Sequence, residues 1–322
     1  MYSQYTPPDA ASCRDNRRGQ HSPASVSEPL ATVKIGCQLP QGISDFQKLS
    51  EIALNCEKLG YDSVWTYDHL SPFWTKHGEG LEGWTLLAAI AQRTSTIKVG
   101  TLVTNVNLRK PALLAKMAST VDNLSGGRLI LGLGTGDRLS RVELESHGYR
   151  FEGLNDRIGR LRETILILKS LWTEDLTSFN GRHYRLAAAA SYPKPIQRPH
   201  PPIWVGGRHP RILEVAAELA DGWNHWGVAP NRLPQMEQYL DTRCEQFGRR
   251  PESITKSWAG QLRNLSEIEN GGSSVVEKVR VELRNQTSPG TDYLIATLGP
   301  RVELSSYEVF AEAAESVWNH GV

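Results

Sequence analysis

The chain has 322 residues, of which 39% are hydrophobic and 22% charged, and its formal net charge is +1. This length suits two ordinary domains or one α/β barrel of about 250 residues with extensions. A net charge this close to zero excludes a strong positive electrostatic field that would attract nucleic acid or an anionic membrane surface. No segment has the roughly 18 to 20 consecutive apolar residues that a membrane helix requires. We therefore expect a small-molecule substrate, with no nucleic-acid and no membrane partner.

The N-terminal segment differs in composition from the rest. Residues 1–31 are rich in Ser, Pro, Arg and Asn and lack the apolar core of a signal peptide, so we predict a disordered tail followed by one folded domain over 32–322. The four cysteines form no Cys-x-x-Cys pair, which is typical of a reducing compartment and predicts a cytoplasmic protein. No His-x-His or His-Glu-x-x-His pattern occurs, and we expect no metal site.

Apolar runs and helical stripes alternate along the chain. The first helix is expected to begin at Ser44, with Gln47 completing a capping box, and to end at Gly60. Strands are expected near residues 33–39, 61–66, 97–104, 129–133, 203–205, 222–226, 254–260 and 292–297. About eight strand–helix repeats predict an α/β fold of the (β/α)8 TIM-barrel type.

One connection is longer than the others. Between the expected fourth and fifth strands, after a long amphipathic helix marked by Ile158 to Trp172, lie about 25 residues that include Gly181 and a run of prolines from Pro193 to Pro202. Because long connections in compact domains are usually functional, we predict an extended insertion here that acts as a lid over the site.

The fourth strand runs into a glycine-rich bend. Leu129–Leu133 is apolar without alternation, as in a strand covered on both faces, and Gly134, Thr135, Gly136 and Asp137 follow it at the carboxyl edge. The glycines would let the backbone approach a ligand closely, although a simple tight turn explains them equally well. The spacing Gly-x-Gly-x-Gly is not the dinucleotide fingerprint Gly-x-Gly-x-x-Gly.

Titratable residues follow two of the expected strands. Asp68 and His69 lie at the carboxyl end of the second strand, where an imidazole could exchange a proton and the carboxylate could fix its tautomer. Glu143 follows the glycine-rich bend and would be a proton donor if burial raised its pKa; an exposed helix start is the alternative. Gly206 and Gly207, before an expected helix, form a candidate phosphate-binding nest of backbone amides.

From residue 33 onward the sequence resembles the bacterial-luciferase-like flavin and deazaflavin oxidoreductases, most closely the branch that uses coenzyme F420. The motifs that carry this resemblance are Asp62–His69, Val99–Thr104, Arg109–Lys116, Ser125–Leu129, Pro202–Gly207 and Ala220–Asn224. The resemblance implies a TIM barrel with the cofactor ring across the carboxyl ends of the strands.

The resemblance also implies roles for individual residues. Asp68 and His69 would contact the ring near its reactive edge, and His69 would stabilise or protonate a group during hydride transfer. Val103, Thr104 and Asn105 match a bulge, often with a cis peptide, that supports the ring from behind.

Four glycine-loop residues and one glutamate complete the implied site. Thr135 and Gly136 match positions near the cofactor's side chain, and Gly206 and Gly207 match the phosphate-binding nest. Glu143 aligns with a glutamate that donates a proton in some relatives.

Three functions are compatible with these features. The first is an F420-dependent oxidoreductase that transfers a hydride to or from a C=C, C=N or alcohol/carbonyl substrate. The second is an FMN-dependent monooxygenase that uses reduced flavin and O2, and the third is a barrel that binds the cofactor without turnover. By the same resemblance we expect a homodimer.

Overall fold

Eight parallel strands close into a barrel in the computed structural model, which describes residues 33–71, 78–262, 265, 273–299 and 303–318. The order around the barrel is β1-β10-β9-β8-β7-β4-β3-β2. The barrel strands are β1 (Lys34–Gln38), β2 (Ser63–Thr66), β3 (Lys98–Asn105), β4 (Leu129–Gly134), β7 (Ile203–Gly206), β8 (Gly222–Trp226), β9 (Thr255–Gly260) and β10 (Tyr293–Thr297). The predicted TIM barrel is confirmed.

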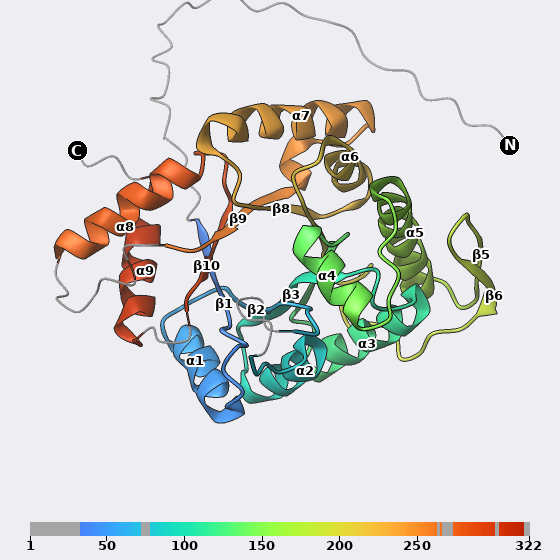
Figure 1. Cartoon of the computed structure of the whole chain (residues 1–322), viewed down its shortest axis with the longest axis horizontal. Helices are drawn as coiled ribbons and strands as arrows, with labels where there is room; N and C mark the ends of the chain where they lie inside the picture. The colour runs from blue at the N-terminus through green and yellow to red at the C-terminus, as the bar shows by residue number, and fades with distance from the viewer. Residues whose placement is uncertain (1–32, 72–77, 263–264, 266–272, 300–302, 319–322) are drawn as a thin grey trace, which may run out of the picture. The chain divides into compact units, whose positions relative to one another are not determined.

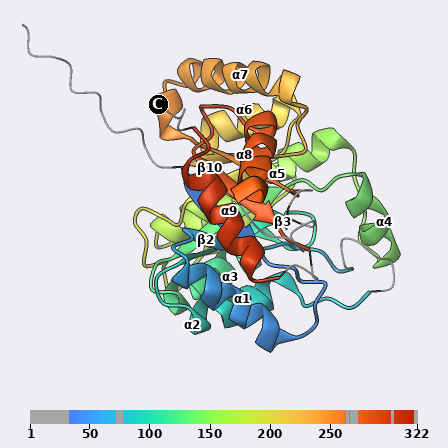
Figure 2. The ribbon, with the colours of Figure 1, turned by 90° about the vertical axis from the view of Figure 1, so that its left-hand side faces the viewer.

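Helices surround this barrel in the order in which they leave the strands (Figure 1). They are α1 (Phe46–Lys58), α2 (Gly83–Arg93), α3 (Pro111–Leu124), α4 (Arg138–Ser146), α5 (Leu154–Thr173), α6 (Pro210–Leu219), α7 (Leu233–Gln246), α8 (Ser273–Gln286) and α9 (Ser305–Glu315). Figure 2 shows α8 and α9 side by side, and α4 standing apart from the other helices. Within the described residues, no helix combines the length and apolarity needed to cross a membrane.

Helix starts follow from local chemistry. The carboxylate of Glu82 accepts hydrogen bonds from the amides of Trp84 and Thr85, at 3.1 and 2.7 Å, and so caps α2. The predicted cap of α1 at Ser44 is wrong by one residue. Asp45 is the cap, since its carboxylate accepts from the amide of Lys48 at 3.2 Å, and the Ser44 hydroxyl donates to Glu79 instead.

Large side chains fill the interior of the barrel. The ring centroids of Trp65 and Trp204 lie 5.0 Å apart, and that of Tyr293 lies 5.3 Å from Trp204. Gly100 makes room for this packing, because a Cβ there would come within 2.5 Å of the Trp65 ring. Leu102 belongs both to this cluster and to the lining of a cavity above it, so the cluster forms the floor of that cavity.

Strand β3 carries the expected irregularity. Its pairing with β4 shifts register between Thr101 and Thr104, and the peptide bond between Leu102 and Val103 is cis. The Val103 side chain lies against Gly134, where a Cβ would come within 2.5 Å of it. The bulge implied by the family resemblance is therefore present in this chain.

The long connection forms a hairpin and not a lid. Strands β5 (Thr177–Asn180) and β6 (Arg185–Ala189) pair antiparallel, and the carboxylate of Glu163 on α5 accepts hydrogen bonds from amides at the hairpin turn. Asp122 on α3 accepts from the amide of Ile196 at 2.7 Å. No residue of 174–202 lines the cavity at the barrel mouth, so the insertion is confirmed but the predicted lid is wrong.

The predicted disordered tail over residues 1–31 lies outside the described residues and stays a prediction, as does the single folded domain over 32–322.

Candidate active site

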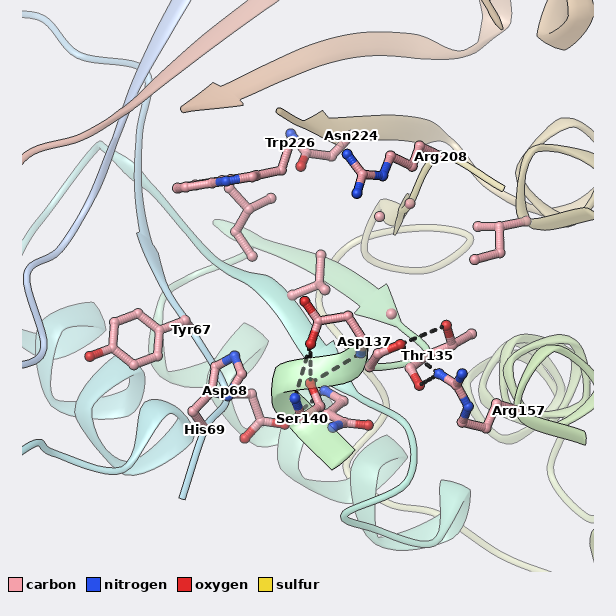
Figure 3. A pocket seen from close by; sticks show the side chains of 18 of the residues that line it. Tyr67, Asp68, His69, Thr135, Asp137, Ser140, Arg157, Arg208, Asn224 and Trp226 are labelled. Carbon is pink, nitrogen blue, oxygen red and sulfur yellow. Dashed lines mark hydrogen bonds between the residues drawn. The ribbon is translucent and has the colours of Figure 1, made fainter. Parts of the chain in front are cut away.

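A cavity of about 760 Å³ opens at the carboxyl ends of the strands, lined by residues that end or follow β1, β2, β3, β4, β7, β8 and β10 (Figure 3). Most of the predicted site residues meet in this cavity. Those that line it are Asp68, His69, Val103, Asn105, Thr135, Gly136, Gly206 and Gly207. Residues from distant parts of the chain thus converge, because parallel strands bring their carboxyl ends to one face of the barrel.

The Thr104 side chain does not line the cavity, and its predicted part in supporting the ring stays a prediction. Its hydroxyl donates to Thr101 at 2.9 Å and accepts from the Trp84 indole at 3.1 Å, so the side chain points towards α2. This orientation lies at the bulge, where a register shift changes which side chains of a strand face inward. Val103, its neighbour, lines the cavity.

His69 and Glu143 form a close pair beside the cavity. Glu143 lies on α4, and one of its carboxylate oxygens is 2.8 Å from Nδ1 of His69. The other oxygen accepts from the amides of Leu70 and Ser71, the latter at 2.8 Å. The glutamate therefore holds both the imidazole and the backbone that carries it.

The pKa of Glu143 is lowered, which corrects the expectation of a proton donor. Burial opposes ionisation, but the hydrogen bonds from His69 and from the amides of Ser71 and Leu70 outweigh it. Glu143 is thus a carboxylate at neutral pH. Because it accepts a hydrogen bond from Nδ1–H, a neutral His69 carries its lone pair on Nε2.

The carboxylate of Asp68 binds other groups of the protein. Its carboxylate is 3% exposed and receives a bidentate pair of bonds from Arg109, at 2.6 and 2.8 Å, and a third from the amide of Asn105 at 2.9 Å. Burial raises the pKa of Asp68, and the guanidinium opposes that rise. Asp68 ties the end of β3 to the residues that precede α3, and its predicted contact with a ring stays a prediction.

A buried arginine supports the glycine-rich bend. Arg157 on α5 donates to the carbonyl oxygens of Thr135 and Gly136 at 2.8 and 2.6 Å, and its guanidinium lies 4.1 Å from the ring centroid of Phe151. Gly136 has a φ of +71°, which favours glycine. Arg157 is 8% exposed, and in the described part of the chain it forms no ion pair with a carboxylate.

Gly206 and Gly207, at the end of β7, do not offer both of their backbone amides to an anion. The amide of Gly207 donates to the carbonyl oxygen of Asn224 at 3.1 Å, so this amide is already used within the protein. Arg208 follows directly, is exposed and lines the cavity. An anion near Gly206 and Gly207 would therefore meet the side chain of Arg208.

The cavity also has residues that the sequence-based prediction did not name, among them Arg157, Arg208 and Trp226. Arg208 could have been found, because it directly follows the predicted nest, and Trp226 could have been found at the end of a predicted strand. Arg157 could not be identified from its position in the sequence, because it lies within a long amphipathic helix and follows no strand directly. Among the described residues, no group of three His, Cys, Asp or Glu side chains could hold a metal ion.

Curated relatives match between about half and two thirds of the chain. An F420-dependent glucose-6-phosphate dehydrogenase of Amycolatopsis mediterranei is 35% identical over 178 residues, which are 54% of this chain and 52% of the relative. An F420-dependent hydroxymycolic acid dehydrogenase of Mycobacterium tuberculosis is 32% identical over 202 residues, or 62% of this chain and 54% of the relative. The chain thus spans about half the length of the curated relatives it matches.

Solved structures agree on the fold. An F420-dependent secondary alcohol dehydrogenase in complex with an F420-acetone adduct superimposes with a TM-score of 0.75 at 19% identity, covering 88% of this chain and 98% of that one. The sequence also matches the family of luciferase-like monooxygenases over residues 29–262. This match covers well over half of the sequence and includes the residues of the cavity through Gly227. The chain belongs to the luciferase-like monooxygenase family.

Proposed function

We propose that this protein is an F420-dependent oxidoreductase that transfers a hydride between F420 and a small organic substrate at the mouth of the barrel. The names of the curated relatives support the cofactor. The observation that carries the chemistry is the 2.8 Å contact between His69 and Glu143, which fixes a proton-exchanging imidazole at the edge of a large cavity.

The residues present fit such a cofactor. F420 combines a flat deazaflavin ring with a side chain that carries phosphate and carboxylate groups. Val103 offers a surface for the ring above the tryptophan cluster. Arg157, a buried cation that forms no ion pair in the described residues, and Arg208 at the cavity edge would face the anionic side chain.

F420 would supply a ring carbon that accepts or donates a hydride and that reacts poorly with oxygen. Side chains of the protein would accept and return the proton. With Nδ1–H held by the Glu143 carboxylate, Nε2 of His69 would accept a proton from a substrate hydroxyl, or return one to a carbonyl oxygen in the reverse direction. Glu143 acts through His69 and is a positioning residue in this scheme.

Turnover measurements test this function. The purified protein is mixed with F420 and a panel of alcohols, and reduction of F420 is followed by its absorbance. We expect reduction by at least one alcohol, and a loss of about a hundredfold in kcat for His69→Ala, as for removal of a general base. Full turnover by His69→Ala would contradict the role of His69.

The two alternative functions, an FMN-dependent monooxygenase and a barrel that binds the cofactor without turnover, predict different results in these assays. Oxygen consumption with reduced FMN, without any reaction of F420, would identify an FMN-dependent monooxygenase. Binding of F420 without turnover across a panel of donors and acceptors would identify a cofactor-sequestering barrel. A cytoplasmic location and a homodimer stay predictions.

A further inference from the structure

A second cavity, of about 370 Å³, lies beside the active-site cavity and, among the described residues, shares no lining residue with it. Its walls are residues 106–110 between β3 and α3, Tyr149, Arg150 and Glu152 between α4 and α5, Arg160 on α5, and His183 and Tyr184 at the turn of the β5–β6 hairpin. Its volume lies in the range of small-molecule sites. The proposed function makes no use of this second cavity.

The connection over residues 174–202 supplies one wall of the second cavity. The carboxylate of Glu163 on α5 accepts hydrogen bonds from the amides of His183 and Tyr184, each at 3.0 Å, and so fastens the hairpin turn beside α5 (Figure 1). Gly159 leaves room for this turn, because a Cβ there would come within 2.5 Å of Nε2 of His183. The insertion, which is not a lid over the active site, thus helps to build a separate cavity.

Positive charges outnumber negative ones in the second cavity. Among its described lining residues, Arg109, Lys110, Arg150 and Arg160 are cations and Glu152 is the only carboxylate. Hydrogen bonds from Arg160, and the nearby charge of Arg150, lower the pKa of Glu152, so Glu152 is ionised at neutral pH. Even with this negative charge counted, the described lining keeps an excess of positive charge.

Two of the four cations are neutralised by carboxylates of the protein. Arg160 binds Glu152 through two hydrogen bonds, at 2.6 and 2.9 Å, and Arg109 binds two carboxylates outside the cavity lining. Lys110 and Arg150 are exposed, and in the described part of the chain they form no ion pair. An anion that enters the cavity would therefore meet two cations whose charge no described carboxylate balances in direct contact.

Two helices begin at the rim of the second cavity. Helix α3 begins directly after Lys110, and α5 begins two residues after Glu152. Among the described residues, no side chain caps the N-terminus of either helix. Free amides and the helix dipole make both N-termini electropositive. The backbone thus favours the same sign of ligand charge as the side chains of Lys110 and Arg150.

The glycine-rich bend separates the second cavity from the active-site cavity. The side-chain amide of Asn107, which lines the second cavity, donates to the carbonyl oxygen of Thr135 at 2.9 Å. Arg157, which lines the active-site cavity, donates to the same carbonyl oxygen at 2.8 Å and to that of Glu152 at 3.1 Å. The two cavities thus lie on either side of one bonded wall, and each can hold a ligand of its own.

We propose that the second cavity is a binding site for a dianionic phosphate monoester, held by Lys110 and Arg150 and separate from the site of the cofactor. Two cations that lack a carboxylate partner match one group that carries two negative charges. The guanidinium of Arg150 can bind two phosphate oxygens at once, and the ammonium of Lys110 binds as a point charge. This proposal does not rest on the proposed function, since it concerns residues outside the active-site cavity.

Titration calorimetry with two probes tests the class of ligand. Methyl phosphate is a dianion at a pH of about 8, because its second proton is then lost, whereas dimethyl phosphate keeps a single charge. In about 0.15 M NaCl we expect methyl phosphate to bind with a Kd of about 1 mM or less, at least about tenfold more tightly than dimethyl phosphate. No binding of methyl phosphate, or equal affinity for the two probes, would overturn the proposal.

Substitutions locate the bound phosphate. Lys110→Met and Arg150→Met should each raise the Kd of methyl phosphate by about fivefold or more, because each removes one charge-assisted contact. Arg182→Met is the matched control, since Arg182 is exposed, directly precedes His183 and does not line the cavity. It should leave the Kd unchanged. An unchanged Kd in both Lys110→Met and Arg150→Met would overturn the proposal, because the phosphate would then be bound elsewhere.

A titration of the F420-loaded protein tests whether the two sites are separate. With the active-site cavity filled, we expect the Kd of methyl phosphate to stay within about threefold of its value in the cofactor-free protein, and Lys110→Met and Arg150→Met to raise it as before. Loss of methyl phosphate binding in the loaded protein would overturn the proposal of a separate site. A protein that does not bind F420 contradicts the proposed function alone, since the titrations of the cofactor-free protein test the phosphate site without it.

Discussion

The imidazole of His69 and the carboxylate of Glu143 lie 2.8 Å apart, although 74 positions separate them in the sequence. His69 follows β2 and Glu143 lies on α4, which projects beyond β4 at the barrel mouth. The contact joins the segment after β2 to the helix after β4, although β3 lies between these two strands in the barrel, and it fixes which nitrogen of the imidazole faces away from the carboxylate. The same carboxylate also binds two backbone amides next to His69, so one residue sets both orientation and position.

Glu143→Gln should lower kcat by tenfold to a hundredfold and leave the Kd of F420 within about twofold. A neutral amide cannot serve both Nδ1–H and the two backbone amides as a carboxylate does, so the imidazole is held less well. Glu145→Gln is the matched control, because Glu145 lies on the same helix and, among the described residues, forms an ion pair only with exposed Arg141. Equal kcat values for Glu143→Gln and the wild type would contradict this role.

Arg157→Met should raise the Kd of F420 by about tenfold. The substitution removes both a cation and the bonds to the carbonyls of Thr135 and Gly136, while it keeps most of the apolar volume. Arg160→Met is the control on the same helix, since Arg160 pairs with Glu152 and does not line the cavity. Fluorescence titration with F420 measures both, and equal effects of the two substitutions would count against a specific role of Arg157.

Asp68→Asn should destabilise the protein by about 3 kcal/mol in urea unfolding. It removes the charge opposite Arg109, whose side chain is mostly buried, and leaves that cation with the 2.9 Å contact to the more exposed Glu82 in place of the bidentate pair. Asp156→Asn breaks the exposed pair with Arg182 and should cost less than about 1 kcal/mol. A similar small loss for both substitutions would show that Asp68 does not hold this part of the barrel.

His225 should make the stability of the protein depend on pH. It is 1% exposed, its ring nitrogens have no hydrogen-bond partner among the described residues, and burial lowers the pKa of His225 from its ordinary value of 6.5 to about 4. Above pH 6.5 the residue is neutral in both states and contributes nothing. As the pH falls from 6.5 to 4, the unfolded chain binds a proton that the folded chain excludes, so the free energy of unfolding should fall by up to about 3 kcal/mol.

The variant His225→Phe isolates this contribution. Phenylalanine keeps an aromatic ring beside Trp223, whose ring centroid lies 5.2 Å from that of His225, and it cannot bind a proton. The free energy of unfolding of this variant should decline less between pH 6.5 and 4 than that of the wild type. Parallel declines would show that other groups cause the pH dependence.

The barrel could be predicted from the sequence because its signals are local. The strand predicted over 222–226 has those bounds, and the bulge after Leu102 was expected from the family resemblance. The β5–β6 hairpin was missed, since most side chains in both strands are exposed or only half-buried and no alternation marks them. The direction of the Thr104 side chain could not be predicted, because the bulge changes which side chains of β3 face inward.

The site could be predicted only in part, because some of its properties depend on contacts between distant segments of the chain. Residues at the carboxyl ends of strands, such as His69, could be placed from the strand pattern alone. The pKa of Glu143 depends on where its carboxylate lies in three dimensions, and it moved in the direction opposite to the one considered. The bonds from Arg157 to the glycine-rich bend likewise depend on how α5 packs against the barrel, which the sequence does not specify locally.

The most direct test of the central claim is a parallel titration of the cofactor-free protein with F420 and with FMN, followed by the fluorescence of the cofactors and of tryptophan. We predict micromolar or tighter binding of F420, at least about tenfold tighter than that of FMN, and weakened by Arg157→Met. Preferential binding of FMN would contradict the account, because it would replace hydride transfer to a deazaflavin by flavin chemistry and remove the proton-transfer role proposed for His69.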